Sequence, residues 1–552
     1  MTIPTFKMNA ISGQQVEWTE RVVAVLFTAT LVVAHFIFIV HVGALWRDEV
    51  NTINVVSRPT FEQFWAYLKW DSCPPLWPSL LRLWIGLGFG GVDSSLRVLG
   101  LSMGLAIIAA LWWNAKQLAK AVPLCSLVLL AASPAMILYG DSLRAYGLGN
   151  ALMILSIGVV WRVVDHPTPA RILLATVVCL LSVHALYYNS VLLFAICMGG
   201  AVVGIRHRDW KRPVALLGMG FLCALSLYLP YHERIAGTNE WTMTLKIPIN
   251  VAWLLFKFYT TVKSSGHFVI WIWFALLVVT LHFCIRQQLR SATETSIKEK
   301  DLALFVGTTL VLGITVYFLF LLSLSYVTEP WYYTSIMGFM AALFDISGEQ
   351  IVRAKPGWRL GRLGLIVSIG LLISPNVYQA VHTRFTNVNL IAEKLEAVGK
   401  SEDLIVVCPW YMGITFMRYY HGQTPWITLP LIEDHLVDRR DLIKKRMTER
   451  DAIRPILEKI AATIQSGHHV WFVGTQSYLS PGPFPRELPP PPDKPVSWLE
   501  WPHIQHWMYE TACLFQTIPV NITKVDIPVS ELVSRYEDLD LLRVETIRKE
   551  VF

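Results

Sequence analysis

Residues 22–46 read VVAVLFTATLVVAHFIFIVHVGALW, a stretch of 25 residues without Asp, Glu, Lys or Arg. About 20 apolar residues of α-helix are enough to cross the hydrocarbon core of a bilayer. The stretch is longer than the apolar core of a signal peptide, and the chain continues in the same style after it. We therefore expect it to be the first span of a protein that crosses the membrane many times.

The composition of the 552-residue chain agrees with this. Hydrophobic residues make up 54%, charged residues only 16%, and the mean hydropathy is +0.46, whereas soluble domains carry about 25% charge. These values exclude a disordered chain, a basic nucleic-acid-binding protein and an ordinary cytosolic enzyme. The eight cysteines include no CxxC pair, so we expect neither a disulfide scaffold nor a structural zinc site.

Ten further spans are expected, because uncharged stretches recur along the chain. Ile172–Ile205 has 34 residues, too many for one span, and we divide it at Tyr187-Tyr188-Asn189. The other expected spans are Val98–Ala115, Ala121–Gly140, Ala145–Trp161, Pro213–Tyr231, Ser264–Ile285, Leu302–Thr328, Pro330–Phe344 and Leu363–Val381.

The basic residues predict the orientation. With a cytoplasmic N-terminus, the inner loops hold 16 Lys or Arg in 50 residues, against 9 in 104 residues for the outer segments before residue 382. This asymmetry follows the rule that cytoplasmic loops are enriched in basic residues. We expect a multi-pass protein of a bacterial inner membrane.

Two domains are predicted, a transmembrane domain over residues 1–381 and an extracytoplasmic domain over residues 382–552. The second contains charged, mixed sequence with short apolar runs typical of buried strands, which suggests a small α/β domain. Strands are expected at Leu404–Cys408 and Val470–Gly474, helices near Ile391–Val398 and Arg439–Gln465, and a stiff proline-rich loop over 481–492.

Two apolar segments are interpreted as interfacial rather than spanning. Pro74–Gly90 contains three prolines and Arg82, and counting it as a span would place Lys116 and Lys120 outside. We expect a helix at the outer membrane surface, where tryptophans are common, and a similar piece at Asn250–Thr261. The tryptophans assigned to this interface are Trp65, Trp70, Trp77 and Trp84.

Asp48 and Glu49 are adjacent carboxylates at the outer end of the first span. Ionisable groups at a membrane edge are costly unless they face a cavity or the headgroups. Such a carboxylate can deprotonate an acceptor hydroxyl or bind a divalent cation. The structural alternative is a solvated helix end.

Asp141 and Arg144 lie in the second outer loop, on the same predicted side as Asp48. A guanidinium there can bind a phosphate through two hydrogen bonds. The alternative is an arginine whose side chain extends to the lipid headgroups.

Other outer turns carry polar clusters with the same two interpretations, contact with sugar or phosphate, or a structural role. One cluster is His184 with Tyr187 and Tyr188, and another includes Glu233.

Several short motifs in residues 45–146 resemble polytopic GT-C glycosyltransferases, in the branch of the protein O-mannosyltransferases and the lipid A aminoarabinose transferase. Their order and spacing match that branch, whereas the rest of the chain agrees in architecture only. The motifs are Leu45-Trp46-Arg47-Asp48-Glu49, Asp71-Ser72-Cys73-Pro74-Pro75-Leu76-Trp77, Ser95-Leu96-Arg97-Val98-Leu99-Gly100, Ser133-Pro134, and Asp141 with Arg144-Ala145-Tyr146.

The resemblance implies a mechanism in which a sugar leaves a polyprenyl-phosphate carrier, of undecaprenyl or dolichyl type, on the outer side of the membrane. Asp48 then matches the base that activates an acceptor hydroxyl, with inversion at the anomeric carbon, and Glu49 matches a second acidic position. Arg144 and Arg97 match groups that hold the phosphate, and Asp141 matches an acid of the second loop.

The sequence also departs from the family pattern. Asp71 and Cys73 stand where the family often has histidine. In Glu329-Pro330-Trp331-Tyr332-Tyr333, Trp331 stands where the family usually has an arginine, so the donor pocket is expected to be built differently. Glu329 is a further site candidate. Two acids without a third ligand do not predict a metal site, and the need for a divalent cation stays open.

Three function classes are weighed. The spans carry almost no charge and the acids gather at the outer rim, unlike the midplane sites of transporters. A membrane glycosyltransferase acting on a protein, lipid or glycan acceptor is therefore favoured. A lipid-linked glycan polymerase or ligase, or a lipid or sugar transporter, remains the alternative, and no nucleic-acid partner is expected.

Overall fold

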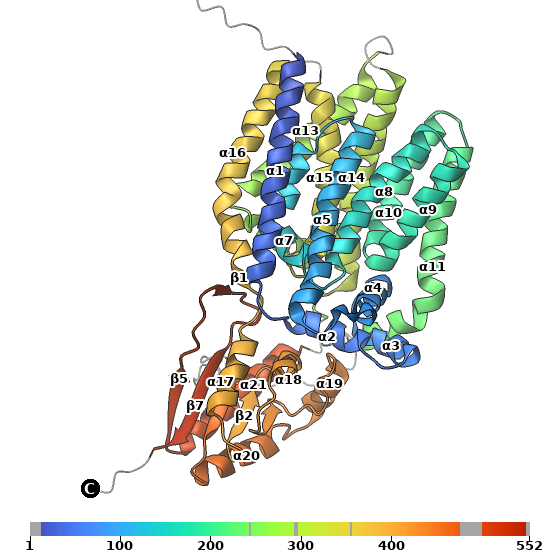
Figure 1. Cartoon of the computed structure of the whole chain (residues 1–552). Helices are drawn as coiled ribbons and strands as arrows, with labels where there is room; N and C mark the ends of the chain where they lie inside the picture. The colour runs from blue at the N-terminus through green and yellow to red at the C-terminus, as the bar shows by residue number, and fades with distance from the viewer. Residues whose placement is uncertain are drawn as a thin grey trace, which may run out of the picture.

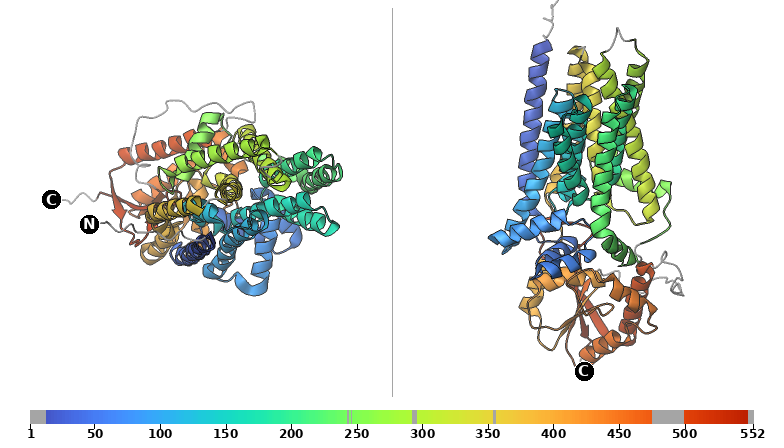
Figure 2. Two further views of the ribbon diagram at one scale, coloured as in Figure 1. Left: turned by 90° about the horizontal axis from the view of Figure 1, so that it is seen from above. Right: turned by 90° about the vertical axis from the view of Figure 1, so that its right-hand side faces the viewer.

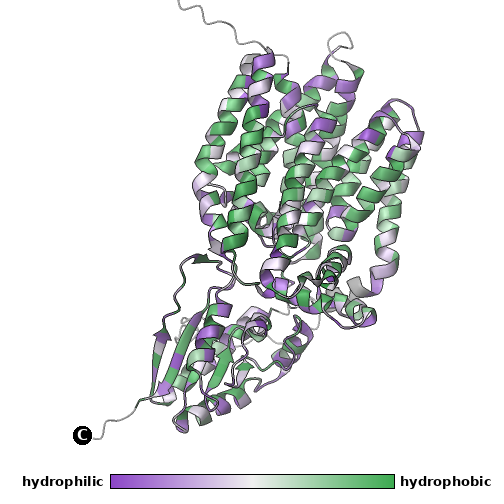
Figure 3. Ribbon diagram, in the orientation of Figure 1, coloured by the Kyte–Doolittle hydropathy of each residue, from purple (hydrophilic) through white to green (hydrophobic). Residues whose placement is uncertain are grey.

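The computed structural model describes residues 13–241, 244, 246–291, 296–353, 356–474 and 499–547. A bundle of long helices carries a smaller C-terminal α/β domain at one end (Figure 1). Hydrophobic residues cover the bundle, whereas polar residues gather at its two ends and on the C-terminal domain (Figure 3). The predicted class, a mainly α membrane protein with a C-terminal α/β domain, is confirmed.

Nine helices of the described residues are long and apolar enough to cross a membrane. The split of Ile172–Ile205 is also confirmed, because the shorter α9 (Pro169–Ala185) ends just before α10 begins. The nine are α1 (Gly13–His41), α5 (Asp93–Leu118), α8 (Tyr146–Asp165), α10 (Asn189–Arg206), α11 (Lys211–Trp241), α13 (Val269–Leu289), α14 (Ile297–Leu324), α15 (Pro330–Val352) and α16 (Pro356–Val381).

The expectation of one continuous span over Ala121–Gly140 is wrong. Three short helical pieces occupy it, α6 (Leu124–Ser126), the π-helical η3 (Leu127–Ala131) and α7 (Pro134–Gly140). The break lies at Ser133, whose backbone is extended, because a residue before proline is disfavoured in the helical region. The eleven predicted segments are thus nine long helices, one shorter helix and one broken one.

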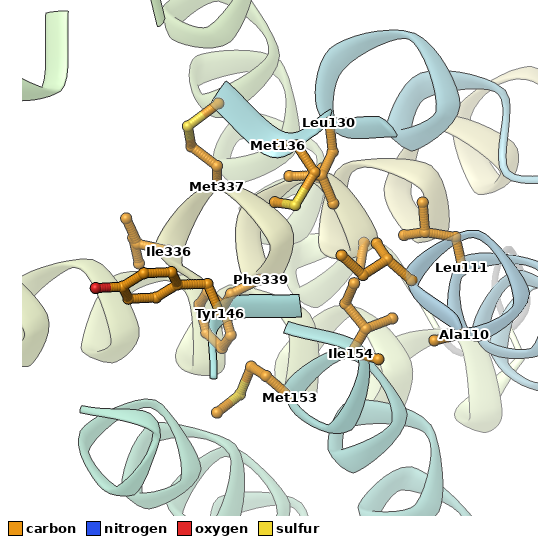
Figure 4. Packing of buried hydrophobic residues seen from close by; sticks show 14 of the residues in the cluster. Ala110, Leu111, Leu130, Met136, Tyr146, Met153, Ile154, Ile336, Met337 and Phe339 are labelled. Atoms are coloured by element: carbon orange, nitrogen blue, oxygen red, sulfur yellow. The ribbon is translucent and has the colours of Figure 1, made fainter. Parts of the chain in front are cut away.

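The centre of the bundle is formed by α8 and α15, which are buried along most of their length. Ala110 and Leu111 of α5 and Ile154 of α8 pack together with Met136 of α7 and Phe339 of α15 (Figure 4). Close helix contacts require small residues. A Cβ atom at Gly104 of α5 would lie 1.7 Å from Asp141 Oδ1.

Short helices cover the end of the bundle that faces the C-terminal domain (Figure 1). As predicted, Pro74–Gly90 forms no span, and α4 has only nine residues. Trp77 is an exception to the predicted interfacial tryptophans, because it is fully buried and its Nε1 donates to the Leu143 carbonyl at 3.1 Å. The elements are α2 (Arg47–Val56), α3 (Phe61–Tyr67), η1 (Leu68–Trp70), α4 (Leu76–Trp84), η2 (Ile85–Phe89) and α12 (Val251–Lys263).

The C-terminal domain contains a five-stranded sheet of order β3-β2-β4-β7-β5. The strands β3 (Trp426–Thr428), β2 (Leu404–Val407) and β4 (Val470–Gly474) are parallel, whereas β7 (Asp540–Thr546) is antiparallel to β4 and to β5 (Val520–Val525). Both predicted strands are confirmed. Thr383–Arg384 (β1) and Leu532–Val533 (β6) form a separate pair.

Helices α17 (Val388–Val398), α18 (Gly413–Tyr419), α19 (Arg440–Thr448), α20 (Arg454–Gln465) and α21 (Glu500–Thr517) complete the C-terminal domain. The single helix expected near Arg439–Gln465 is in fact two, and α20 has a proline in its first turn, where a missing N–H costs nothing. The predicted proline-rich loop lies outside the described residues.

Polar contacts attach the C-terminal domain to the first long loop, at the end of the bundle opposite the N-terminus (Figure 2). Arg418 Nη2 lies 2.6 Å from Asp93 Oδ1, and the Tyr419 hydroxyl donates to Asp93 Oδ2 at 2.5 Å. Asn54 Nδ2 of α2 donates to the Leu436 carbonyl at 2.8 Å. The two segments that the sequence predicted to share one side of the membrane are therefore in contact.

Candidate active site

A cavity of about 360 Å³ lies where the end of the bundle meets the C-terminal domain. The bundle side of its wall comes from the start of α2, from the loop that carries Arg144, and from the residues around the start of α15. The C-terminal domain supplies the opposite side, including the residues before α19 and the start of α21. Asp48 and Arg144, both predicted as site residues, line this cavity together.

Asp48 occupies the first turn of α2, where a helix favours negative charge. Its Oδ1 accepts from Arg47 Nε at 3.1 Å and from Arg47 Nη2 at 3.0 Å. Burial acts to raise the pKa of Asp48, but the charges of Arg47 and Arg144 outweigh it, and the pKa lies below its usual value. Asp48 is therefore a charged carboxylate at neutral pH.

Arg144 is buried and held in position by a set of acceptors. Its Nη1 lies 3.1 Å from Asp71 Oδ1 and donates to the Asp48 carbonyl oxygen at 3.1 Å. The same nitrogen contacts the Thr52 hydroxyl, and Nη2 donates to Ser72 Oγ at 3.0 Å. Arg144 and Ser72 thus present a cation and a hydroxyl to the cavity, close to Asp48.

Asp71 is a residue whose role the sequence analysis missed. It is buried, and besides Arg144 it accepts a hydrogen bond from Thr52 Oγ1 at 2.6 Å. A buried carboxylate requires a partner of opposite charge or several donors. The sequence did indicate Asp71, because it lies two residues before Cys73 in the motif that departs from the family pattern. In the structure, Asp71 fixes the Arg144 side chain.

Glu49 and Arg97 form a buried ion pair away from the cavity lining. Arg97 Nη1 donates to Glu49 Oε1 at 2.5 Å, and the Leu143 amide donates to the same oxygen at 2.8 Å. Glu49 also caps α2 by accepting from the Trp46 amide at 3.3 Å. These contacts give Glu49 and Arg97 a positioning role, joining α2, α5 and the Arg144 loop.

Asp141 is likewise buried in a pair, with His35 of α1. The His35 Nδ1 atom lies 2.7 Å from Asp141 Oδ2. Asp141 does not line the cavity, so the structure separates it from Asp48 and gives it a contact between helices.

The remaining outer-turn candidates do not line the Asp48 cavity. His184 lines a second, largely apolar hollow of about 390 Å³ and lies 3.2 Å from Ser226 Oγ. Tyr188 is buried against Tyr317, Tyr187 lies half-buried in the turn before α10, and Glu233 is exposed on α11. None of these four therefore shares the cavity with Asp48.

Glu329, in contrast, does line the Asp48 cavity. It is the residue before α15, its Oε1 accepts from Lys257 Nζ at 3.0 Å, and its Oε2 accepts from the Tyr536 hydroxyl at 2.8 Å. Glu329 thus links α12, α15 and the C-terminal domain at the wall of the cavity.

The C-terminal domain adds charged residues that the sequence analysis did not select, namely Asp438, Arg440, Glu500 and Glu537. Arg440 lies 3.1 Å from Asp438 Oδ2 through Nε and 2.7 Å from Glu500 Oε2 through Nη1. Glu537 accepts from the Arg47 amide at 2.7 Å, and burial raises its pKa to about 7. No sequence motif indicates these four residues, because they come close to Asp48 only when the C-terminal domain docks on the bundle.

Aromatic rings form much of the remaining cavity wall. The Trp331 ring lies 5.7 Å from Trp46, 5.5 Å from Tyr536 and 6.4 Å from Tyr146, measured between centroids. Aromatic walls with a few oriented polar groups are typical of small-molecule sites. Among the described residues, no group of three or more His, Cys, Asp or Glu is arranged to hold a metal ion.

No family model and no curated protein matches the chain. The chain is similar to ArnT from Cupriavidus metallidurans. The apo structure of ArnT is 12% identical, with a TM-score of 0.48 over 94% of this chain and 97% of that one. The structure of ArnT bound to undecaprenyl phosphate is 13% identical, with a TM-score of 0.47 over 82% and 93%.

An oligosaccharyltransferase from Archaeoglobus fulgidus, tethered to an acceptor peptide, is 9% identical, with a TM-score of 0.46 over 93% of this chain and 74% of that one. All three TM-scores are below 0.5.

Proposed function

We propose that the protein is a membrane glycosyltransferase that moves a sugar from a polyprenyl-phosphate carrier to an acceptor hydroxyl. One observation carries the proposal. The Asp48 carboxylate and the Arg144 guanidinium, 96 residues apart, line one aromatic-walled cavity at the end of a membrane bundle. A base and a phosphate-binding cation side by side at the membrane edge are what transfer from a lipid phosphate requires.

The proposed transfer of the sugar to the acceptor is an in-line displacement. The acceptor oxygen attacks the anomeric carbon and its proton passes to the Asp48 carboxylate. The bond from the anomeric carbon to the phosphate oxygen breaks, and the electron pair leaves with the phosphate. Arg144, oriented by Asp71, stabilises the negative charge on the departing phosphate, and the hydroxyl of Ser72 is placed to donate to it.

The low pKa of Asp48 suits a late proton transfer. A carboxylate with a lowered pKa is always ionised but is a weak base. Glycosyl transfer passes through a transition state with oxocarbenium character, in which the acceptor hydroxyl becomes acidic as its bond to carbon forms. Asp48 then accepts the proton after most of the charge has developed.

The topology proposed with this function has a cytoplasmic N-terminus and an extracytoplasmic cavity in a bacterial inner membrane. The acceptor is a protein, lipid or glycan hydroxyl. Whether the transfer needs a divalent cation is part of the test. A glycan polymerase or ligase of the same architecture is the alternative if the acceptor proves to be a growing glycan chain.

The test compares the wild type with Asp48→Asn in detergent. Both are supplied with undecaprenyl phosphate and dolichyl phosphate carrying different sugars, together with protein, lipid and glycan hydroxyl acceptors, and release of the free lipid phosphate is followed with and without EDTA. We expect release from at least one donor, reduced about 100-fold or more in Asp48→Asn, the usual scale for a general base.

Asp451→Asn is the matched control, because Asp451 is an exposed acid of the C-terminal domain that does not line the cavity. A folded Asp48→Asn protein with normal turnover would remove Asp48 from the role of base. Donor binding without release from any donor by the wild type would favour a transporter.

A further inference from the structure

The loop before α19 brings Asp438 of the C-terminal domain next to the α2 residues that carry Asp48. The Asp438 amide donates to Asn51 Oδ1 at 2.9 Å, and Asn51 lies one helical turn beyond Asp48 on α2. Residues three apart on a helix share one face, and Asp48, Asn51 and Asp438 all line the cavity. The position of Asp438 is therefore fixed relative to the reacting groups.

The two oxygens of Asp438 have different surroundings. Oδ2 accepts from Arg440 Nε at 3.1 Å, whereas Oδ1 is buried and has no hydrogen-bond partner. A buried polar atom without a partner costs about 1–3 kcal/mol, and more when charged. The Asp438 side chain lines the cavity and is 16% exposed, so a hydroxyl bound in the cavity can reach this carboxylate and supply the missing hydrogen bond.

Two more polar atoms of the cavity residues share this property. Trp46 Nε1 and Thr244 Oγ1 are buried without a hydrogen-bond partner, and both residues line the cavity. Together with Asp438 Oδ1 they are one acceptor, one donor and one hydroxyl, on residues of a cavity that is also lined by aromatic rings. This combination matches the hydroxyl groups and apolar faces of a sugar ring better than it matches a lipid tail.

The charged cavity residues of the C-terminal domain, called here the C-terminal wall, indicate which kind of sugar the cavity can bind. Asp438 and Glu500 are acids in this wall, and Glu537 is partly protonated at neutral pH because burial raises its pKa to about 7. Arg440, the one cation of this wall among the described residues, is engaged by Asp438 and Glu500. A sugar that carries a carboxylate would meet like charges here, and like charges brought together at a binding site are costly.

We propose that Asp438 is a specificity-determining residue, whose Oδ1 accepts a hydrogen bond from a hydroxyl of the transferred, uncharged sugar. The inference rests on the proposed function and adds to it that the C-terminal domain selects the sugar. Arg144 then binds the phosphate, which all donors share, and Asp438 binds a hydroxyl of the sugar, in which the donors differ.

The test measures equilibrium binding by tryptophan fluorescence of the full-length protein in detergent. The probes are undecaprenyl phosphate alone and the same lipid carrying glucose, mannose or glucuronate. We expect the wild type to bind a glucose- or mannose-bearing lipid more tightly than the bare lipid. Asp438→Asn should abolish this preference, weakening sugar-lipid binding about 10- to 100-fold, and leave the bare lipid unaffected.

Asp438→Asn is the informative variant, because its amide oxygen can still accept from Arg440 while an N–H group replaces the free acceptor. Asp451→Asn is again the control and should bind every probe as the wild type does. Arg144→Ala should weaken binding of the sugar-bearing and the bare lipid alike, which separates the phosphate from the sugar.

Deoxy-glucose and deoxy-mannose lipids provide a test that does not depend on folding of the variant. One deoxy analogue, which lacks the hydroxyl bound by Asp438, should bind the wild type about 10-fold or more weakly than its parent sugar does. Asp438→Asn should bind this analogue and its parent with similar affinity.

Three outcomes would overturn the assignment: equal binding of all deoxy analogues by the wild type, an unchanged sugar preference in folded Asp438→Asn, or tightest wild-type binding of glucuronate. Failure of the proposed function would instead appear as an absence of sugar transfer in the release assay, whatever the binding pattern.

Discussion

Arg47 and Asp48 illustrate how neighbouring side chains set the chemistry of a single carboxylate. Burial alone would raise the pKa of Asp48, and the charge and hydrogen bonds of Arg47 are the strongest influence in the opposite direction. The neighbour is therefore as important to the state of Asp48 as its position in the cavity.

Replacing Arg47 by methionine should change the pH profile of sugar transfer. Without the guanidinium, burial dominates and the pKa of Asp48 rises, so activity should fall as the pH is lowered from neutral. The wild type, in which the pKa lies below the usual carboxyl value of about 3.9, should show no such loss between about pH 5 and pH 8. The measurement is kcat/KM against pH for both proteins.

An unchanged acid limb in the Arg47 variant would show that other cations, Arg144 foremost, are sufficient to hold Asp48 ionised. A suitable control is Arg58→Met. Arg58 follows α2 in the same outer segment and does not line the cavity.

The sequence could predict single site residues only where a motif surrounds them. Asp48 and Arg144 stood out because each follows an apolar span, and the structure places both at one cavity. Arg97 and Glu49 had the same appearance in sequence, but their mutual ion pair is invisible there because it joins residues 48 positions apart. Asp438 and Glu537 had no signal, since their relation to Asp48 depends on how the C-terminal domain docks.

At the scale of elements, the contact between α1, α5 and the loop after α7 depends on the absence of a side chain. The space beside Gly104 is filled by the Asp141 carboxylate, which is also paired with His35. This contact holds the segment that leads into Arg144.

Gly104→Ala should therefore destabilise the bundle, by about 1–3 kcal/mol as is typical of overpacking, because the new Cβ would overlap Asp141 Oδ1. Thermal unfolding in detergent measures the effect. Gly364→Ala on α16 is the matched control, since no atom lies within 4 Å of the position where its Cβ would be.

Equal unfolding temperatures for the two alanine variants would mean that Asp141 can move aside. In that case the His35–Asp141 pair does not fix the Arg144 loop.

Helices were predictable from hydropathy where they are long and uninterrupted. The one wrong span, Ala121–Gly140, is as apolar as the others, but the Ser133-Pro134 step interrupts it and the resulting short helices are buried inside the bundle. Hydropathy reports how apolar a segment is, and it does not distinguish a segment surrounded by lipid from one surrounded by protein.

At the scale of the whole molecule, the docked C-terminal domain contributes a titratable contact. Glu537 is almost fully buried and accepts from the Arg47 amide at 2.7 Å. Its pKa in the folded protein is about 7, against 4.5 for the ordinary group. The folded state therefore retains a proton that the unfolded chain releases.

The contribution of Glu537 to stability is fully present below about pH 4.5 and is lost as the pH rises through about 7, with a total change on the order of 3 kcal/mol. Glu537→Gln keeps a neutral side chain at every pH, so its stability should change less than that of the wild type between pH 5 and pH 8. Unfolding temperatures measured at intervals over this range give the comparison.

Parallel curves for wild type and Glu537→Gln would indicate that Glu537 stays ionised in the folded protein. Glu458→Gln, a change of an exposed acid on α20 outside the cavity, controls for the general effect of removing one negative charge.

The position of the cavity between two domains has a further consequence for the fate of the sugar. Water is itself a hydroxyl nucleophile, and an activated donor exposed to it would be hydrolysed without benefit to any acceptor. A cavity with one wall formed by the C-terminal domain exposes a bound donor to less bulk solvent than an open surface would. If the proposed sugar transfer is correct, the strength of the attachment through Asp93, Arg418 and Tyr419 sets its fidelity, measured as the ratio of sugars transferred to the acceptor to sugars lost to water.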